Sequence, residues 1–181
     1  MKDIIRMKTS LSEEVEILLN GQVKMEAKSS AIYLAMAAYC DQLGFENSSE
    51  FFFTQAEEER QHMLKIFRYV SDAGATPISP DVTEVPQDFG SFRGVFESAL
   101  EQEIEVTNAI NKILSVAYKE GDHATANFLQ WFVREQQEEE FTARKRVELF
   151  DVIGEEGIGR YMIDQKMPEI GPPESEVDPI E

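Results

Sequence analysis

Polar side chains of the carboxylate, imidazole and amide types stand at the same spacing in the two halves of the sequence. Each half has one glutamate, then a glycine, and then two polar residues that are three positions apart. A shift of 77 residues superimposes Glu103 on Glu26, Gln136 on Glu59, Glu139 on His62, and Gly121 on Gly44. Residues three apart share one face of an α-helix, so the pattern predicts two similar helical hairpins that carry one polar plan.

The spacing predicts that these six polar side chains lie at one level of a helical bundle. Each glycine is nearly midway between the first glutamate and the later pair, and antiparallel helices rise equally per residue. Glu26 is therefore level with Glu59 and His62, and Glu103 is level with Gln136 and Glu139. All six interrupt apolar stripes, so we expect them to point inward and to meet when the hairpins pack.

Several buried carboxylates at one level indicate a metal site. Each would cost on the order of several kcal/mol without a compensating charge, and no Lys or Arg occupies the neighbouring stripe positions. Carboxylates with one imidazole suit iron, manganese or zinc, and this set has the pattern of di-iron bundles. A single inward glutamate is more often a hydrogen-bonded core acid, and a lone histidine is usually structural. The coincidence of six residues favours a two-metal site.

Other candidates lie beside this set, and each has a second interpretation. Glu58, Glu135 and Glu138 flank the same helices, where they are either iron-collecting acids or a solvated acidic face. Tyr33 is two helical turns after Glu26 and either assists the metal site, by a hydrogen bond or as an electron donor, or packs in the core. Cys40 is interpreted as a buried apolar thiol.

The apolar periodicity predicts an all-α fold. We expect one helix from Ser10, with a capping box to Glu13, to residue 43, and a second from a capping signal at Asn47 to Gly74. A third should run from Ser91 to residue 120, and a fourth should follow a tight break at Gly121 and Asp122 and end near residue 153. Residues 75–90 contain three prolines and can extend over roughly 50 Å, against about 42 Å for a 28-residue helix. They therefore predict a long crossover between the second and third helices.

The C-terminal part of the chain is predicted to be less regular. Residues 154–166 could hold a short fifth helix, so we expect one domain over 1–166 and a flexible acidic tail over 167–181.

The composition of the chain excludes some classes of binding partner and of cellular location. The 181 residues carry a formal net charge of -18, which disfavours nucleic acid and anionic membranes as partners. No run of 18 apolar residues and no cleavable leader pattern is present, and the single cysteine cannot form an internal disulfide. These features predict a cytoplasmic protein.

The quoted residues, with the stretch NFLQWFVREQQEEE over 127–140 and GIGRYMID over 157–164, closely resemble bacterial non-haem ferritins from about residue 11 to residue 167. The resemblance implies a homo-oligomeric shell of 24 subunits that oxidises iron(II) with dioxygen or hydrogen peroxide and stores iron(III). It also implies three iron positions per subunit. The first uses Glu26, Glu59 and His62, the second uses Glu103, Glu139 and Gln136, with Glu59 bridging, and the third uses Glu58, Glu135, Glu138 and Glu139.

Some positions depart from related families. Bacterioferritins have a second ExxH motif, where this chain has Gln136 and Glu139, and Arg60 stands where their haem-binding methionine is expected. No haem is therefore expected. The leading prediction is iron storage and detoxification by a ferroxidase; a di-iron oxidoreductase acting on peroxide or a small substrate, and a purely structural assembly, are the alternatives. Outward apolar residues such as Phe51 and Phe53 are predicted to lie at subunit contacts.

Overall fold

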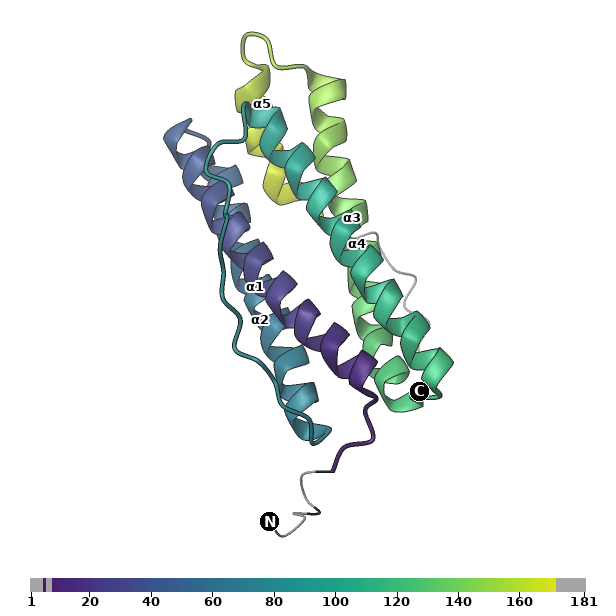
Figure 1. The fold of residues 1–181 in the computed structure, drawn as a ribbon. Coiled ribbons are helices and arrows are strands. Elements are labelled where there is room, and N and C mark those ends of the chain that lie inside the picture. Colours follow the sequence, from purple (N-terminus) through teal and green to yellow (C-terminus); the bar gives the residue numbers. More distant parts are fainter. Residues whose placement is uncertain (1–4, 6–7, 172–181) are drawn as a thin grey trace.

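The computed structural model describes residue 5 and residues 8–171, and within them the protein is an all-α bundle (Figure 1). The four long helices are α1 (Glu13–Gln42), α2 (Glu46–Asp72), α3 (Phe92–Glu120) and α4 (His123–Ile153). A short helix α5 (Gly159–Lys166) and a 3-10 turn η2 (Met167–Glu169) follow. This is the predicted four-helix bundle with a long crossover and a short fifth helix.

Glycine turns join the helices into two antiparallel hairpins. Gly44 connects α1 to α2 with a φ of 81°, and Gly121 ends α3 with a φ of 72°. Only glycine adopts this left-handed conformation without steric cost, so both turns fall where the sequence predicts them.

Two of the expected helix starts are wrong in detail. The N-cap of α1 is Ser12, whose Oγ accepts from the Val15 amide at 3.3 Å, and not Ser10. Helix α2 begins at Glu46 after Phe45, which has no capping side chain, so Asn47 lies inside the helix instead of capping it.

A distant carboxylate caps α2 in place of a local side chain. Asp164 in α5 accepts hydrogen bonds from the Ser48 amide at 2.9 Å, the Ser48 hydroxyl at 2.7 Å and the Asn47 side-chain amide at 2.9 Å. Anions are favourable at a helix N-terminus, so these bonds hold α5 against the start of α2.

The crossover lies along the full length of the bundle beside α1 and α2 (Figure 1). Asn20 in α1 accepts from the Ile78 amide at 2.8 Å, and Lys24 pairs with Asp81 at 2.7 Å. Near its end, Phe89 packs edge-on against Tyr39 with ring centroids 5.5 Å apart. The crossover therefore places the two hairpins side by side, as its length predicts.

The apolar core forms two clusters on either side of a polar layer. One contains Phe52, Phe96 and Phe150, and the other contains Ile66 and Ile110. Glu59, His62 and Glu103 fall between these positions along α2 and α3, and all three are buried. The apolar clusters thus enclose the predicted metal-binding level.

The C-terminal end of the fold differs from the expectation at its boundary. Met167 is fully buried and Ile170 accepts a hydrogen bond from Arg146 at 2.9 Å, so packing continues past residue 166. The predicted flexible tail otherwise lies in residues 172–181, outside the described residues.

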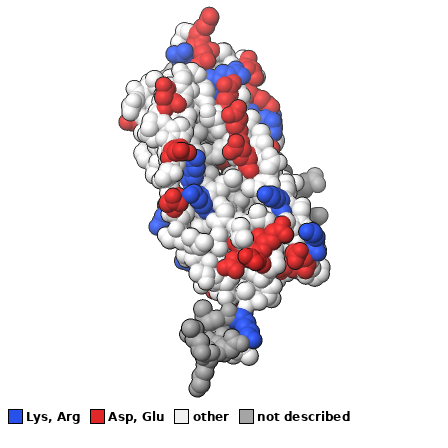
Figure 2. All heavy atoms as spheres, in the orientation of Figure 1, with Lys and Arg blue, Asp and Glu red and all other residues white. Residues whose placement is uncertain are grey.

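On the surface, acidic side chains gather in patches on the face shown in Figure 2. Phe53 is 48% exposed, but Phe51 is partly buried against the core, so the prediction that Phe51 is an outward position is wrong. Within the described residues, none of the helices combines the length and the apolarity that crossing a membrane requires.

Candidate metal centre

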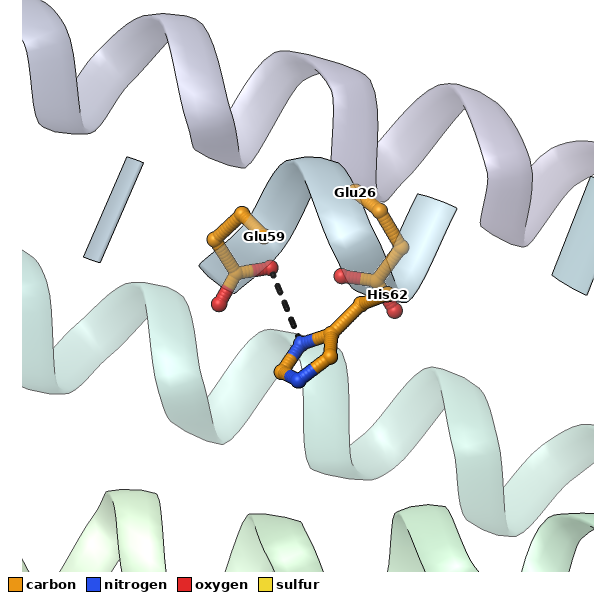
Figure 3. A group of neighbouring side chains, drawn as sticks. All are labelled: Glu26, Glu59 and His62. Carbon is orange, nitrogen blue, oxygen red and sulfur yellow. Dashed lines mark ion pairs between the residues drawn. The ribbon is translucent and has the colours of Figure 1, made fainter. Parts of the chain in front are cut away.

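Glu26 from α1 and Glu59 and His62 from α2 converge in the polar layer (Figure 3). One ligand-type atom from each lies within 4.8 Å of the other two. Bonds from a first-row metal ion to such atoms are about 2.0–2.3 Å long, so small side-chain rotations would bring all three onto one ion. These are the three residues expected at the first iron position.

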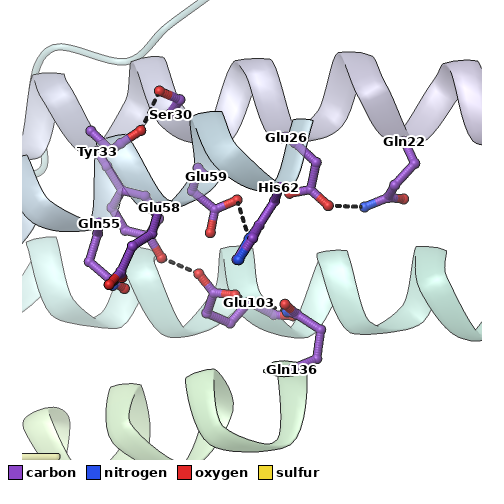
Figure 4. A network of polar contacts seen from close by, with 11 residues as sticks. Gln22, Glu26, Ser30, Tyr33, Gln55, Glu58, Glu59, His62, Glu103 and Gln136 are labelled. Carbon is purple, nitrogen blue, oxygen red and sulfur yellow. Dashed lines mark hydrogen bonds and ion pairs between the residues drawn. The ribbon is translucent and has the colours of Figure 1, made fainter. Parts of the chain in front are cut away.

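Glu103 from α3 forms the other half of the layer, and its oxygens are held by two donors (Figure 4). The Tyr33 hydroxyl donates to Glu103 Oε1, and Gln136 Nε2 donates to Glu103 Oε2 at 3.0 Å. Tyr33 also stacks on Phe52, so the hydrogen-bonding and packing interpretations both hold. Gln136 is buried against Glu103, at the level that the spacing predicts.

Burial raises the pKa values of these carboxyls in the metal-free protein. Burial, followed by the charge of Glu59, raises the pKa of Glu26 well above its usual value, and burial followed by the charge of Glu103 does the same for Glu59. Burial also raises the pKa of Glu103, although the hydrogen bonds from Tyr33 and Gln136 oppose this. For Glu139, burial and then Glu103 raise the pKa to about 8.

The buried carboxylates also lack partners that could neutralise them. Among the described residues, no Lys or Arg forms an ion pair with Glu26, Glu59 or Glu103. Buried Glu26 Oε2 and Glu59 Oε2 accept no hydrogen bond, while His62 Nδ1 lies 3.6 Å from Glu59 Oε2. Unpartnered buried oxygens are costly, so the layer is suited to receive a cation.

A side pocket of about 310 Å³ lies next to this layer, between α2 and α4. It is lined by the four acids expected at the third position, Glu58, Glu135, Glu138 and Glu139, together with Gln55 and Arg146 among others. Glu58 and Glu138 are exposed and Glu135 is half-buried, so this group is wetter than the inner layer. Glu139 lines this pocket, and its charge also raises the pKa of Glu59 in the buried layer.

Two residues of the site were not singled out from the sequence. Gln22 is buried and donates to Glu26 Oε1 at 2.8 Å (Figure 4), and Arg146 is buried in the side pocket. Helical spacing carried a signal for both, because Gln22 precedes Glu26 by four residues and Arg146 follows Glu139 by seven.

Three other side chains take structural positions. Trp131 packs edge-on against His62 with ring centroids 5.4 Å apart. Cys40 is fully buried, and burial raises the pKa of its thiol to about 12, as expected of an apolar thiol. His123 is the first residue of α4.

Comparison with known proteins gives consistent matches. The family model of the ferritin-like domain matches residues 17–153. The chain is 38% identical to the probable bacterial non-haem ferritin-like protein of Haemophilus influenzae, over 87% of this chain and 95% of that protein. It is 36% identical to the bacterial non-haem ferritin of Campylobacter jejuni, over 86% of this chain and 93% of that protein.

One solved structure is similar to this chain over the same share of its length. The open pore ferritin of the hyperthermophilic archaeon Archaeoglobus fulgidus superimposes with a TM-score of 0.84 at 37% identity. The match covers 87% of this chain and 98% of that one.

Proposed function

The chain belongs to the ferritin family, and we propose that it oxidises iron(II) in pairs at the buried carboxylate layer and stores the product inside a shell of identical subunits. Iron(II) is the substrate of this reaction, and the oxidised iron is what the shell stores. The observation that carries the proposal is the layer itself: acids from three helices are buried together without a basic partner, and two of their oxygens accept no hydrogen bond.

The side chains divide into two iron positions. Glu26, Glu59 and His62 would hold the first iron, since their ligand atoms already lie within 4.8 Å of one another. Glu103 and Glu139 would hold the second, with Gln136 beside it. Glu59 is affected by the charges of both Glu103 and Glu139, which supports its role as the carboxylate shared by the two ions.

Two adjacent irons allow a two-electron step. Each iron(II) loses one electron, and the two electrons, together with two protons, reduce dioxygen to hydrogen peroxide, or hydrogen peroxide to two molecules of water. The raised pKa values of Glu26, Glu59 and Glu139 favour the protonated carboxyls, so iron would compete with protons for these side chains. Carboxylate oxygens also favour the iron(III) product over iron(II), because the higher charge is held more strongly.

Tyr33 would act on the second position through Glu103. Its hydroxyl donates to one oxygen of Glu103 and leaves the other oxygen to Gln136. The two hydrogen bonds fix the carboxylate in one orientation before iron arrives, which lowers the cost of ordering it. Tyr33 is therefore proposed as a positioning residue, and as an electron source only if a radical is detected.

A third iron would bind more weakly in the side pocket. Glu58, Glu135 and Glu138 are more exposed than Glu26, Glu59 and Glu103, so solvent and partial hydration weaken the attraction to a cation. Glu139 lines this pocket and interacts with the inner layer, which supports transfer of iron between the two.

Apolar residues on the outside of the bundle support assembly. Ile17 is 63% exposed, Leu34 is 48% exposed and Phe53 is 48% exposed. A shell of 24 chains of 20.6 kDa would have a mass of about 490 kDa, and closed symmetry is the common way to cover such surfaces. Light scattering should give this mass, and a monodisperse monomer at micromolar concentration would exclude the shell.

The oxidation proposal is tested by adding iron(II) to the iron-free protein without oxygen and then mixing with oxidant. The parent should show a fast phase that saturates at two irons per subunit. Glu59→Ala should lose this phase and keep the shell, while Glu57→Ala, two residues earlier and exposed, should behave like the parent. Unchanged fast oxidation in Glu59→Ala would show that the centre is wrongly placed, and a dependence on an organic substrate would favour the oxidoreductase alternative.

A further inference from the structure

We infer that Arg146 makes the side pocket a site for an oxyanion that binds together with iron. The inference deepens the proposed function, because it rests on the third iron position formed by Glu58, Glu135, Glu138 and Glu139.

Arg146 is buried without the partners that a guanidinium usually has. Only 6% of its surface is exposed, and its Nε donates to no acceptor. One of its terminal nitrogens donates to the Ile170 carbonyl at 2.9 Å, and the guanidinium carbon lies 3.9 Å from the centre of the Phe51 ring. An arginine has five N–H donors in a planar fork, so most of this capacity is unused by the described residues.

The charge of Arg146 is also not matched by a direct ion pair. Within residue 5 and residues 8–171, no Asp or Glu lies within ion-pair distance of its guanidinium. Burial lowers its pKa to about 10, while the charges of Glu139 and Glu58 oppose this shift. Arg146 therefore remains positive near neutral pH and faces the acids of the pocket from a distance.

The pocket thus contains donors for an anion and acceptors for a cation. An iron ion alone would gain from the carboxylates but would be repelled by the guanidinium. An oxyanion alone would gain from the guanidinium but would be repelled by the glutamates. When both bind, each is adjacent to the opposite charge, and a planar fork matches two oxygens of one phosphate or carboxylate group.

Thermodynamic linkage then requires that the binding of iron and the binding of the oxyanion depend on each other. If the oxyanion raises the affinity of the pocket for iron, iron raises its affinity for the oxyanion by the same factor. The cavity of about 310 Å³ has room for both. The consequence is that the protein should retain an oxyanion only after iron has reached the side pocket.

Inorganic phosphate is the tetrahedral oxyanion that solution supplies, and its oxygens match the planar donors of Arg146.

The experiment measures the retention of radiolabelled inorganic phosphate by the full-length shell. Parent, Arg146→Met, Arg146→Lys and Arg144→Met proteins are loaded with three irons per subunit, oxidised, exposed to phosphate and freed of unbound label. Arg144→Met removes an exposed arginine of α4 that pairs with Glu140, and it is the matched control. A protein without iron is the blank for each variant.

The parent and Arg144→Met should retain phosphate, and Arg146→Met should retain at least about fivefold less, the lower end of typical coupling factors. Arg146→Lys should fall between them because it keeps the charge and loses the fork. Light scattering shows that each variant has formed its shell. Retention in Arg146→Met equal to the parent would overturn the inference.

Iron-soaked crystals separate this inference from the proposed function. Anomalous scattering near Glu58 and Glu135, without Arg146-dependent phosphate retention, would refute the oxyanion site and leave the third iron position intact. No iron in the side pocket at any loading would refute the third iron position itself.

Discussion

Replacing Glu139 by Gln should stabilise the iron-free protein, and the size of the effect should depend on pH. Burial and the charge of Glu103 raise the pKa of Glu139 from 4.5 to about 8. Between these two values the folded protein binds a proton that the unfolded chain releases, so the stability of the folded state falls as pH rises. Glutamine has nearly the same shape and carries no charge at any of these pH values.

The magnitude follows from the pKa shift. Each pKa unit corresponds to about 1.4 kcal/mol. The charge of Glu139 therefore lowers the free energy of unfolding by about 3 kcal/mol at pH 7 and by about 5 kcal/mol above pH 8. Below about pH 4.5, Glu139 is protonated in both states and costs nothing. The advantage of Glu139→Gln should therefore be absent near pH 4.5, grow through neutral pH and level off above pH 8.

The assay is urea unfolding of the iron-free shell, followed by circular dichroism at several pH values and one subunit concentration. Glu138→Gln is the control, because this neighbouring glutamate is exposed and its replacement should change stability by no more than about 0.5 kcal/mol. A stability difference between Glu139→Gln and the parent that is negative, or constant with pH, would refute the reasoning. When iron is bound, the parent should be more stable than Glu139→Gln, because the carboxylate of the parent binds the metal.

Three further predictions follow from particular contacts. Tyr33→Phe removes a hydrogen bond that lowers the pKa of Glu103, so iron(II) affinity measured by titration should fall more at pH 6 than at pH 8; equal losses would contradict this role. Asp164→Asn weakens the cap of α2 and should lower the free energy of unfolding by about 1–3 kcal/mol in a calorimetric scan, whereas exposed Glu169→Gln should not. Replacing Glu135 and Glu138 together by Ala should spare the first oxidation burst in stopped flow and change later turnovers or the oxidant consumed per iron; repeated additions identical to the parent would mean that these acids are a solvated face.

The sequence alone determined the helices, the hairpins and the level of the inner site. These depend on helical periodicity and on a constant rise per residue, which are local properties of the chain. The positions of Gly44 and Gly121 fixed the two turns, and Glu26 and Glu59 then had to face each other. The site could therefore be predicted before any packing was known, because antiparallel geometry converts equal spacing into proximity.

Only the tertiary structure decided features that depend on contacts between distant segments. Asp164 caps α2 from 116 residues away, so no local pattern near Asn47 could reveal that partner. Arg146 lies on the same helical face as Glu139, but its burial follows from Phe51 and from the Ile170 carbonyl, which arrive from other elements. Spacing along a helix specifies which residues share a face, whereas burial and charge compensation depend on what packs against that face, and this is settled only when the whole chain has folded.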